Sequence, residues 1–482
     1  MKVLFLNPPS LSAQNVVRDS IYGCWCKGKR IGGAMTPPYP LLLLATVLRA
    51  AGHQAEIIDA LAEDLSFDEV VGRCAGVDFV VLLTSVMTFS EDRVVLGELK
   101  RRQPHLKTII YGSIATFMPE FCLRFEEVDF IIRREAEWAL RDFLTDYAAG
   151  GERWKQARGL GYREGGRPVV NDFYPFIENL DDLPFADWSL LKASRRYFNP
   201  AVARHPYVTD LTSRGCPGRC IYCMAPPFYG RKIRARSTQN VLEGFRRHAA
   251  AGYREVYIRD EMFTTFRGRV REICQGIIAE GLDLTWLCSA KVGSIDREAM
   301  DLMKRAGCHT IKLGVESGCQ EILDRVKKDI KVEQTAETFR WAREVGLNTH
   351  AHMMIGAPGE TADTIRRTLK FLKKIKPTTV TFAIITPFPG TPLFEEVAAK
   401  DPKLKDACNL ELADLHSKSF HTDAFCELSP EELAFWLKKA HRSFYLRPAY
   451  ILEWLSRVRS PGDLLKLVRA GSKVIDFSLR GE

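Results

Sequence analysis

Short runs of consecutive apolar residues alternate with longer amphipathic stretches over the first 150 residues. Strands that are apolar on both sides are typical of a parallel sheet covered by helices on both faces. Amphipathic stretches closed by glycine, such as residues 40–52, are typical of the helices between such strands. The pattern therefore predicts a doubly wound α/β domain over residues 1–150, with strands at residues 2–8, 54–60, 77–85, 107–113 and 128–134.

The same alternation returns over residues 206–395, after a segment (151–205) rich in acids, aromatics and prolines that we interpret as a connection. Six strand–helix units in succession predict a partial (β/α)6 barrel, whose active site should lie at the carboxyl ends of its strands. Residues 396–482 have an amphipathic helical pattern, which predicts a C-terminal helical domain. The barrel strands are expected at residues 207–213, 255–260, 284–290, 310–317, 348–356 and 379–386.

Length, composition and charge limit the kinds of protein that this chain can be. The chain has 482 residues, too many for one ordinary domain, and no apolar run of about 18 residues that would span a membrane. No export signal is recognisable, so we expect a cytoplasmic protein whose 13 cysteines stay reduced. The net charge of +9 is moderate and no nucleic-acid-binding motif accompanies it, so no nucleic-acid partner is expected.

Three cysteines lie close together directly after the first barrel strand: Cys216, Cys220 and Cys223, spaced C-x3-C-x2-C. A structural zinc site usually takes four protein ligands, and no second cysteine pair stands at a suitable distance. Three thiolates suit a [4Fe–4S] cluster, in which the protein holds three irons and leaves the fourth open. Pro217 and Gly218 allow the tight wrap that such a loop needs. The alternative, three incidental buried cysteines, does not account for the spacing.

Residues 206–395 resemble the radical SAM enzymes throughout, and the cysteine motif, with Tyr222 before the third cysteine, is the signature of that family. The resemblance implies that the open iron binds S-adenosylmethionine (SAM) through its amino and carboxylate groups. It also implies that one electron, supplied by a donor such as flavodoxin or ferredoxin, cleaves SAM to methionine and a 5′-deoxyadenosyl radical. This radical would abstract hydrogen from an unactivated carbon of a small-molecule substrate, while the protein provides orientation and excludes water.

The resemblance further implies SAM contacts at the ends of the barrel strands. An acid at one strand end is often only solvated, so the order and spacing of the whole set support the assignment. In family members, acids such as those in "YIRDEMFT" lie near the SAM amino group, the glutamate of "KLGVESG" binds the ribose hydroxyls, and the turn in "MMIGAPGET" contacts adenine. The corresponding residues, together with a serine of the third strand, are Asp260, Glu261, Ser289, Glu316 and Ile355.

The pairing of a Rossmann-like first domain with this barrel resembles the cobalamin-binding subclass of the family. "NPP" near the start and "YGSIATFMPE" occupy the expected places. The D-x-H-x-x-G motif that supplies an axial histidine to cobalamin is absent, and Arg134 stands where the subclass often has glycine. The resemblance implies cobalamin between the first sheet and the barrel, with contacts at the strand ends from Ser85, Thr88, Gly112, Ser113, Thr116 and Glu135.

Other residues each allow two interpretations. Cys24 and Cys26 are candidates for quenching a substrate radical, or for sharing a second metal with Cys408 or Cys426; the alternative is ordinary packing. His350 and His352 alternate on the fifth barrel strand and so face the same side, where either would act on substrate or be a core histidine.

The C-terminal stretch 442–480 mixes large apolar residues with Arg and Lys. This composition is compatible with contact to an anionic membrane or a lipid-like substrate, and equally with a capping helix that has a solvated basic face.

Taken together, the residues and the resemblance predict a radical SAM enzyme, cobalamin-dependent, that methylates an unactivated carbon of a hydrophobic or secondary-metabolite substrate. One alternative is a cobalamin-free radical cyclase or carbon–carbon bond-forming enzyme acting on a lipid-like substrate. A second alternative is a non-catalytic iron–sulfur or corrinoid carrier. Bound corrinoid separates the first two, and release of 5′-deoxyadenosine separates both from the carrier.

Overall fold

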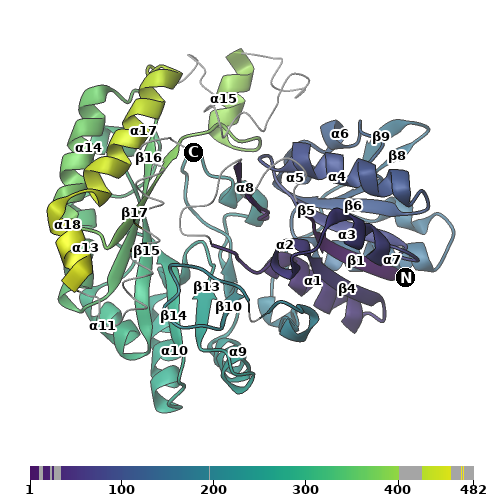
Figure 1. Cartoon of the computed structure of the whole chain (residues 1–482), viewed down its shortest axis with the longest axis horizontal. Coiled ribbons are helices and arrows are strands. Elements are labelled where there is room, and N and C mark those ends of the chain that lie inside the picture. Colours follow the sequence, from purple (N-terminus) through teal and green to yellow (C-terminus); the bar gives the residue numbers. More distant parts are fainter. Residues whose placement is uncertain are drawn as a thin grey trace.

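The computed structural model describes residues 1–9, 15–21, 24–26, 34–194, 196–400 and 426–456, with positions 468 and 471. It contains two α/β units that lie side by side, the first sheet with its helices and the barrel, with the C-terminal helices along the outer side of the barrel (Figure 1). Both sheets were predicted from the sequence and both are confirmed.

The first sheet has seven strands in the order β4-β1-β5-β6-β7-β8-β9. The first five are parallel, and each coincides with a predicted strand. Continuous apolar runs make both faces of these strands hydrophobic, so both faces must be covered. The strands are β1 (Lys2–Asn7), β4 (Gln54–Asp59), β5 (Phe79–Thr84), β6 (Lys107–Gly112), β7 (Phe130–Ile132), β8 (Leu160–Glu164) and β9 (Arg167–Val170).

Alternate residues of the central strand enter two different cores. Phe79 and Val81 of β5 pack with one set of helices, whereas Val80 and Leu82 pack with the other. The first face is covered by α1 (Tyr39–Ala50) and α7 (Ala136–Ala148), the second by α3 (Phe67–Arg73), α4 (Phe89–Arg102), α5 (Ser113–Phe117) and α6 (Pro119–Cys122). This sandwich is the doubly wound arrangement that the sequence predicts.

The hairpin of β8 and β9 is an addition to that prediction. Both strands pair antiparallel at the β7 edge, so the sheet extends into the segment that we placed in the connection. Gly165 and Gly166 form the turn with φ of 56° and 79°, a conformation that glycine adopts without strain. Beyond the hairpin, Leu183, Trp188 and Tyr197 belong to a hydrophobic cluster that continues from the first domain into the barrel.

The second sheet has six parallel strands in the order β10-β13-β14-β15-β16-β17, and all six predicted strands are confirmed. Only their outer faces are closed by helices: along β16 four residues are buried and the four between them are half-buried. The strands are β10 (Tyr207–Asp210), β13 (Glu255–Ile258), β14 (Thr285–Ala290), β15 (Cys308–Glu316), β16 (Asn348–Ile355) and β17 (Thr379–Ile384), and the helices are α9 (Thr238–Ala250), α10 (Arg267–Ala279), α11 (Arg297–Arg305), α12 (Gln320–Arg325), α13 (Val332–Glu344) and α14 (Ala362–Ile375).

The C-terminal helices cover the free edge of the barrel sheet at β17. The Tyr445 hydroxyl, on α17 (Pro430–Tyr445), donates to the Val380 carbonyl at 2.6 Å and accepts from the Val380 amide at 3.0 Å. The Tyr450 hydroxyl, on α18 (Pro448–Ser456), donates to the Thr378 carbonyl. These bonds satisfy backbone groups that an open sheet edge would leave unpaired. In the described part of the chain no helix has both the length and the apolar character needed to cross a membrane. Contact with a membrane surface stays a prediction.

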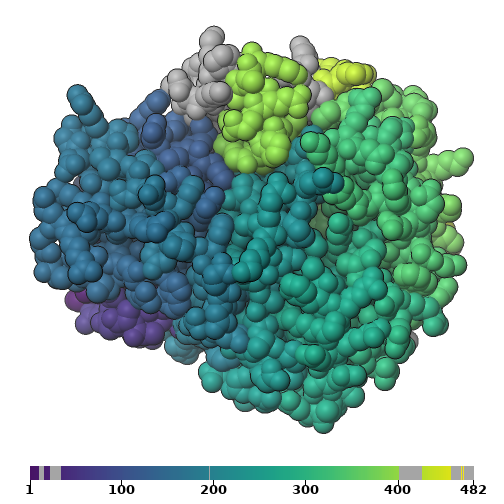
Figure 2. Space-filling model, turned by 180° about the vertical axis from the view of Figure 1, so that it is seen from behind, coloured from purple at the N-terminus to yellow at the C-terminus, as the bar shows by residue number. Residues whose placement is uncertain are grey.

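The two α/β units form one continuous body. In the space-filling view from behind, the first domain (purple to blue) lies directly against the barrel (teal to green) (Figure 2). Helix α15 (Pro392–Lys400) lies above the junction. The carboxyl ends of both sets of parallel strands are where chemistry is expected, so we next describe the loops there.

Candidate active site

The three cysteines of the motif share one loop. It runs from the short strand β11 (Ser213–Arg214) to helix α8 (Ala225–Tyr229), and all three cysteines are half-buried. The Gly218 amide donates to the Cys216 sulfur at 3.4 Å, and a Cβ on Gly218 would lie only 3.2 Å from the same sulfur. Glycine therefore lets the backbone approach the sulfur closely, as an iron–sulfur loop requires.

The donor set fits an iron–sulfur cluster. Among the described residues, no group of three or more His, Cys, Asp or Glu side chains is arranged to hold a single metal ion. In a [4Fe–4S] cluster each cysteine binds a different iron, so its three thiolates need not converge on one point. Burial raises the pKa of the Cys216 thiol, and the Gly218 amide and Lys328 only partly offset this rise. Iron binds the thiolate, so binding of a cluster would release this proton.

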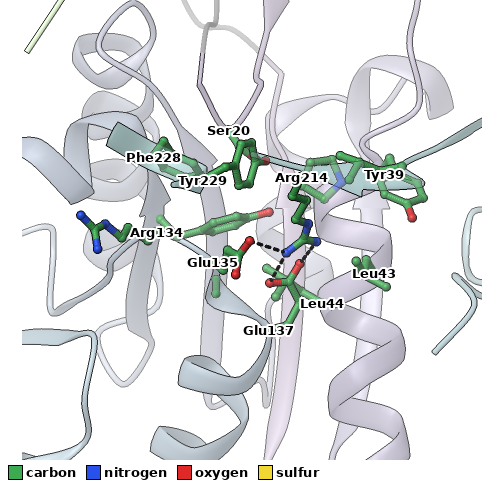
Figure 3. A pocket seen from close by; sticks show the side chains of 14 residues that line it. Ser20, Tyr39, Leu43, Leu44, Arg134, Glu135, Glu137, Arg214, Phe228 and Tyr229 are labelled. Carbon is green, nitrogen blue, oxygen red and sulfur yellow. Dashed lines mark hydrogen bonds and ion pairs between the residues drawn. The ribbon is translucent and has the colours of Figure 1, made fainter. Parts of the chain in front are cut away.

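A pair of arginines joins the cysteine loop to the first domain. β11 pairs with β12 (Arg234–Ala235), so that Arg214 and Arg234 face each other in register. The Arg214 guanidinium donates to Glu137 at 2.5 and 3.2 Å, and the Arg234 guanidinium makes two 2.8 Å bonds to Glu135. Figure 3 shows Arg214 pointing toward both glutamates at the start of α7. We call these four side chains the Arg–Glu clamp.

The clamp is buried, and its charges compensate one another. The four side chains are between 2% and 9% exposed. Burial alone would raise the pKa of Glu135, but Arg214 and Arg234 more than offset it and hold the pKa below its usual value. Glu135 also accepts from the Ile177 amide, so both its oxygens are occupied by protein donors. The sequence indicated Glu135 as a cobalamin contact; the structure places it in the clamp.

Two acids follow strand β13, and they have different surroundings. Asp260 accepts three bonds of 2.6 Å from Thr212 and Ser213, so it fixes the chain just before the cysteine loop. Glu261 is different because its Oε2 atom is buried and has no hydrogen-bond partner among the described residues. Burial raises the pKa of Glu261 to about 8. A buried acceptor without a partner fits a cationic ligand group such as the SAM amine.

Glu316 forms an ion pair at the carboxyl end of β15. Its carboxylate accepts from Lys328 Nζ at 2.7 Å, and both side chains are nearly buried. Glu316 has φ of +62°, an uncommon value for a residue other than glycine, of the kind that clusters at functional sites. A Cβ on Gly314 would lie 2.5 Å from Glu316 and 2.6 Å from Lys328, so only glycine leaves room for the pair.

Lys328 was not identified from the sequence. Burial would lower its pKa, but Glu316 and the thiols of Cys220 and Cys223 raise it well above the usual value. The lysine therefore stays charged between the cysteines and Glu316. A lysine in the "RVKKD" stretch has no recognisable spacing to the cysteines, and only the fold brings it to them.

The remaining predicted SAM residues lie at neighbouring strand ends. Ser289 is half-buried on β14 beside Lys312 of β15. Ile355 ends β16 and is buried. The glycine-rich turn after it is held by Glu360, which accepts from the amides of Gly356 and Ala357. Burial raises the pKa of Glu360 to about 7. Tyr222, which is partly buried, packs against the core beneath the cysteine loop.

The residues indicated for cobalamin in the first domain form a tight cluster at the carboxyl ends of β5 and β6. The Thr88 hydroxyl accepts from the Ser85 amide, and Ser113 accepts from the Val86 amide. Thr116 accepts from the Arg134 amide at 2.8 Å. Gly112 has φ of +121°, and a Cβ there would lie 2.0 Å from the Thr84 carbonyl oxygen. The structure thus brings these five residues together, and Glu135 directly follows Arg134, whose amide donates to Thr116.

A pocket lies between α1, the start of α7, β11 and α8 (Figure 3). Glu135 lines it, and the five cluster residues do not. Within the described residues, three buried donors that line it lack acceptors: the Tyr111 hydroxyl and the Nε atoms of Arg134 and Arg214. Buried polar groups normally have partners, so these donors call for a ligand with acceptor oxygens. Cobalamin fits this requirement through its carboxamide side chains. The enclosed space is about 30 Å³, so it would receive one such side chain and not the corrin ring.

The two histidines of β16 face the inside of the barrel, as their spacing predicts. His350 forms hydrogen bonds with the hydroxyls of Thr379 and Thr381, and His352 forms one with the hydroxyl of Thr381. The centres of the two rings lie 4.5 Å apart. The side chains of Cys24 and Cys26, on β3 (Cys24–Cys26), and the whole of Cys408 lie outside the described residues. Cys426 is buried in the core, and its thiol donates to the Leu428 carbonyl.

Comparison with known proteins agrees with this geometry. The radical SAM superfamily model matches residues 211–372, and the B12 binding domain model matches residues 32–144. An uncharacterized methyltransferase of Pyrococcus horikoshii is 31% identical over 460 residues, which cover 94% of each chain. The anaerobic magnesium-protoporphyrin IX monomethyl ester cyclase of Rubrivivax gelatinosus is 26% identical, over 94% of this chain and 78% of its own.

A solved structure shows the same fold. The radical S-adenosylmethionine methyltransferase TsrM of Kitasatospora setae, with cobalamin and a [4Fe–4S] cluster bound, superposes with a TM-score of 0.70 over 99% of both chains, at 16% identity. The fold and site thus define a class in which a Rossmann-like domain is joined to a SAM-cleaving barrel. The chain belongs to the radical SAM superfamily and carries a B12-binding domain.

Proposed function

We propose that the chain is a cobalamin-dependent radical SAM methyltransferase that transfers a methyl group to an unactivated carbon of a small molecule. The observation that carries the proposal is the Arg–Glu clamp, which fixes the cysteine loop to the first helix turn after the predicted cobalamin cluster. The Arg–Glu clamp would therefore form part of both cofactor sites.

Cys216, Cys220 and Cys223 would hold the [4Fe–4S] cluster, which supplies the electron that cleaves SAM. Glu261 would accept a hydrogen bond from the SAM amine, because its buried Oε2 atom has no partner among the described residues. Glu316, held in place by its ion pair with Lys328, would accept hydrogen bonds from the ribose. The turn after Ile355 would contact the adenine through backbone groups that Glu360 holds in place.

Cobalamin, held by the first domain, would supply a methyl group to substrate. Tyr111 and Arg214 would donate to its side chains from the pocket of Figure 3, whereas the Arg134 guanidinium points away and stacks on Phe173. The sequence has no D-x-H-x-x-G motif, so no histidine of such a motif would bind the cobalt of cobalamin. The described residues that face the junction are mainly aromatic and aliphatic, which excludes water from it.

The cluster needs an external electron donor, and we propose an acidic flavodoxin or ferredoxin. Three exposed basic side chains lie on or near the cysteine loop: Arg219, Arg231 and Lys232. Arg219 pairs with Asp329 and Lys232 with Glu178, while the Arg231 guanidinium donates to the Gly218 carbonyl. Their charge would attract an acidic partner, and such steering weakens as salt is added. A rate of SAM cleavage that falls with ionic strength when flavodoxin is the reductant, and not when dithionite is, tests this point.

Product analysis tests the proposed function. Anaerobically reconstituted enzyme is incubated with cobalamin, SAM and a reductant, and the products are separated by chromatography. A methyltransferase releases both S-adenosylhomocysteine, which remains when SAM loses its methyl group, and 5′-deoxyadenosine. A cyclase releases 5′-deoxyadenosine alone, and the relationship to a cyclase makes this the second candidate. A carrier releases neither product, which would overturn both.

A further inference from the structure

The inner face of the barrel sheet is polar where β14 to β17 run side by side. Lys312 of β15 lies in register with His350 of β16, and His350 lies in register with Thr379 of β17. The next inward row holds Gly314, His352 and Thr381. All of these residues except Thr381, which is exposed, are half-buried. The inside of the barrel is therefore partly dry and carries a concentration of hydrogen-bonding groups.

Lys312 is the cation of this face that lacks a negative partner. Its Nζ atom donates to the Tyr257 hydroxyl at 2.6 Å and lies 5.2 Å from the centre of that ring. By contrast, Arg259 forms a 2.7 Å ion pair with Asp19, and Lys328 pairs with Glu316. Over residues 34–194, 196–400 and 426–456, no Asp or Glu lies within ion-pair distance of Lys312.

The neighbours of Lys312 show the effect of its charge. Burial and Lys312 together lower the pKa of His350 to about 3, and they lower that of His352 well below its usual value, so both rings are neutral. Burial would raise the pKa of Tyr257, but Lys312 and Arg259 lower it. Lys312 therefore acts electrostatically on all three of these rings.

Both nitrogens of the His350 ring are bonded to the hydroxyls of Thr379 and Thr381, whereas His352 uses only its Nδ1 atom, toward Thr381. The Nε2 atom of His352 and the threonine hydroxyls are therefore neutral groups beside a cation, as is usual around a bound oxyanion.

We propose that the inside of the barrel binds an anionic oxygen group of the substrate, a carboxylate or a phosphate, through Lys312, with His350, His352 and Tyr257 as neutral hydrogen-bonding neighbours. This inference rests on the proposed function, because it takes the barrel interior as the place of the substrate. It changes the expectation of a purely hydrophobic or lipid-like substrate. Such a substrate would displace water from Lys312 and leave a buried cation without compensation, which is costly.

Anion binding to the cluster-containing protein tests the inference, and it is measured without reductant so that it does not depend on methyl transfer. The probes are inorganic phosphate, propionate and the neutral analogue propionamide, titrated by calorimetry. Phosphate and propionate separate the two sources of the oxyanion. The variant is Lys312→Met, which keeps the length of the side chain, and the control is Lys304→Met, an exposed lysine of α11.

We expect at least one anion to bind the wild-type protein and the Lys304→Met variant equally, and to bind Lys312→Met at least about tenfold more weakly. Propionamide should not bind. Histidine rings labelled with ¹³C give the location: the signals of His350 and His352 should shift with the anion, while that of exposed His105 should not.

Absence of saturable binding by both anions would overturn the inference, as would equal binding by Lys312→Met or binding of propionamide as strong as that of propionate. Failure of the methyltransferase proposal has a different signature. In that case the anion still binds at the histidines, but S-adenosylhomocysteine is not released.

Discussion

The two parallel sheets of this chain use the same strand type in opposite ways. All six residues of β5 in the first sheet are buried, because helices cover both faces. In β16 of the barrel only every second residue is buried, and the residues between them face the interior. The first sheet thus gives both faces to stability, whereas the barrel keeps one face for chemistry. In the barrel, the candidate substrate-binding residues lie on the face that the helices leave uncovered.

The junction between the two sheets is where their roles meet. The Arg–Glu clamp joins α7, which packs on the fully covered sheet, to the loop that opens into the barrel. Substitutions in the cysteine loop, in the clamp and in each sheet should therefore differ in whether they change iron content, stability or SAM binding.

The largest effect is expected from the cysteine loop. Cys220→Ala should reduce SAM cleavage to background and lower the iron content, because the cluster loses one of its three ligands. The measurements are 5′-deoxyadenosine by chromatography and iron per chain. The matched control is Cys122→Ala, a buried cysteine of the first domain, which should retain both. Normal cleavage by Cys220→Ala would show that the loop does not hold the cluster.

Breaking the clamp should be the next largest effect. Arg214→Met leaves Glu137 buried without its partner, which costs about 3–5 kcal/mol for a buried pair. We expect a lower thermal unfolding temperature together with loss of iron. Lys232→Met is the control, since it removes an exposed ion pair just before β12 and should change neither. Unchanged iron content in Arg214→Met would mean that the clamp only stabilises the fold and does not position the loop.

The contrast between the sheets can be tested by a pair of truncations. Leu82→Ala on the covered β5 should destabilise by about 2–5 kcal/mol, as other large-to-small core substitutions do. His352→Ala on the open face of β16 should cost about 1 kcal/mol or less, because it removes one hydrogen bond from a half-open site. Urea unfolding followed by circular dichroism gives both values. Equal costs would contradict the difference between the two sheets.

The smallest effect concerns pH. Burial holds the pKa of Glu261 near 8 before SAM binds, so the carboxyl is largely protonated at neutral pH. If the ionised form receives the SAM amine, affinity should rise as pH increases toward 8, by up to about tenfold per pH unit, and then level off. Equilibrium binding of labelled SAM without reductant measures this. Glu261→Gln should flatten the profile, and exposed Glu272→Gln should not. A flat wild-type profile would contradict the role of Glu261.

The sequence predicted the features that depend on local pattern. Continuous apolar runs located the five parallel strands of the first sheet, and the C-x3-C-x2-C spacing located the cysteine loop. The hairpin β8–β9 was missed because its strands are short and only partly apolar, although Gly165 and Gly166 marked its turn.

Features made by residues far apart in the chain had no such signal. Arg214 and Glu137 are 77 positions apart, and each is an ordinary charged residue in its own surroundings. Lys312 and Tyr257 are 55 positions apart. Their pairing depends on strand register, which a single sequence does not specify. Glu135 shows the reverse case, because its place at a strand end indicated a ligand contact while the arginines that occupy it could not be foreseen.

The most direct test of the account is Mössbauer spectroscopy of ⁵⁷Fe-reconstituted protein with and without SAM. We predict a [4Fe–4S] signal in which one iron changes its environment when SAM is added, while the three irons held by Cys216, Cys220 and Cys223 do not. A spectrum that SAM leaves unchanged, or protein that takes up zinc in place of iron, would contradict the assignment of these three cysteines.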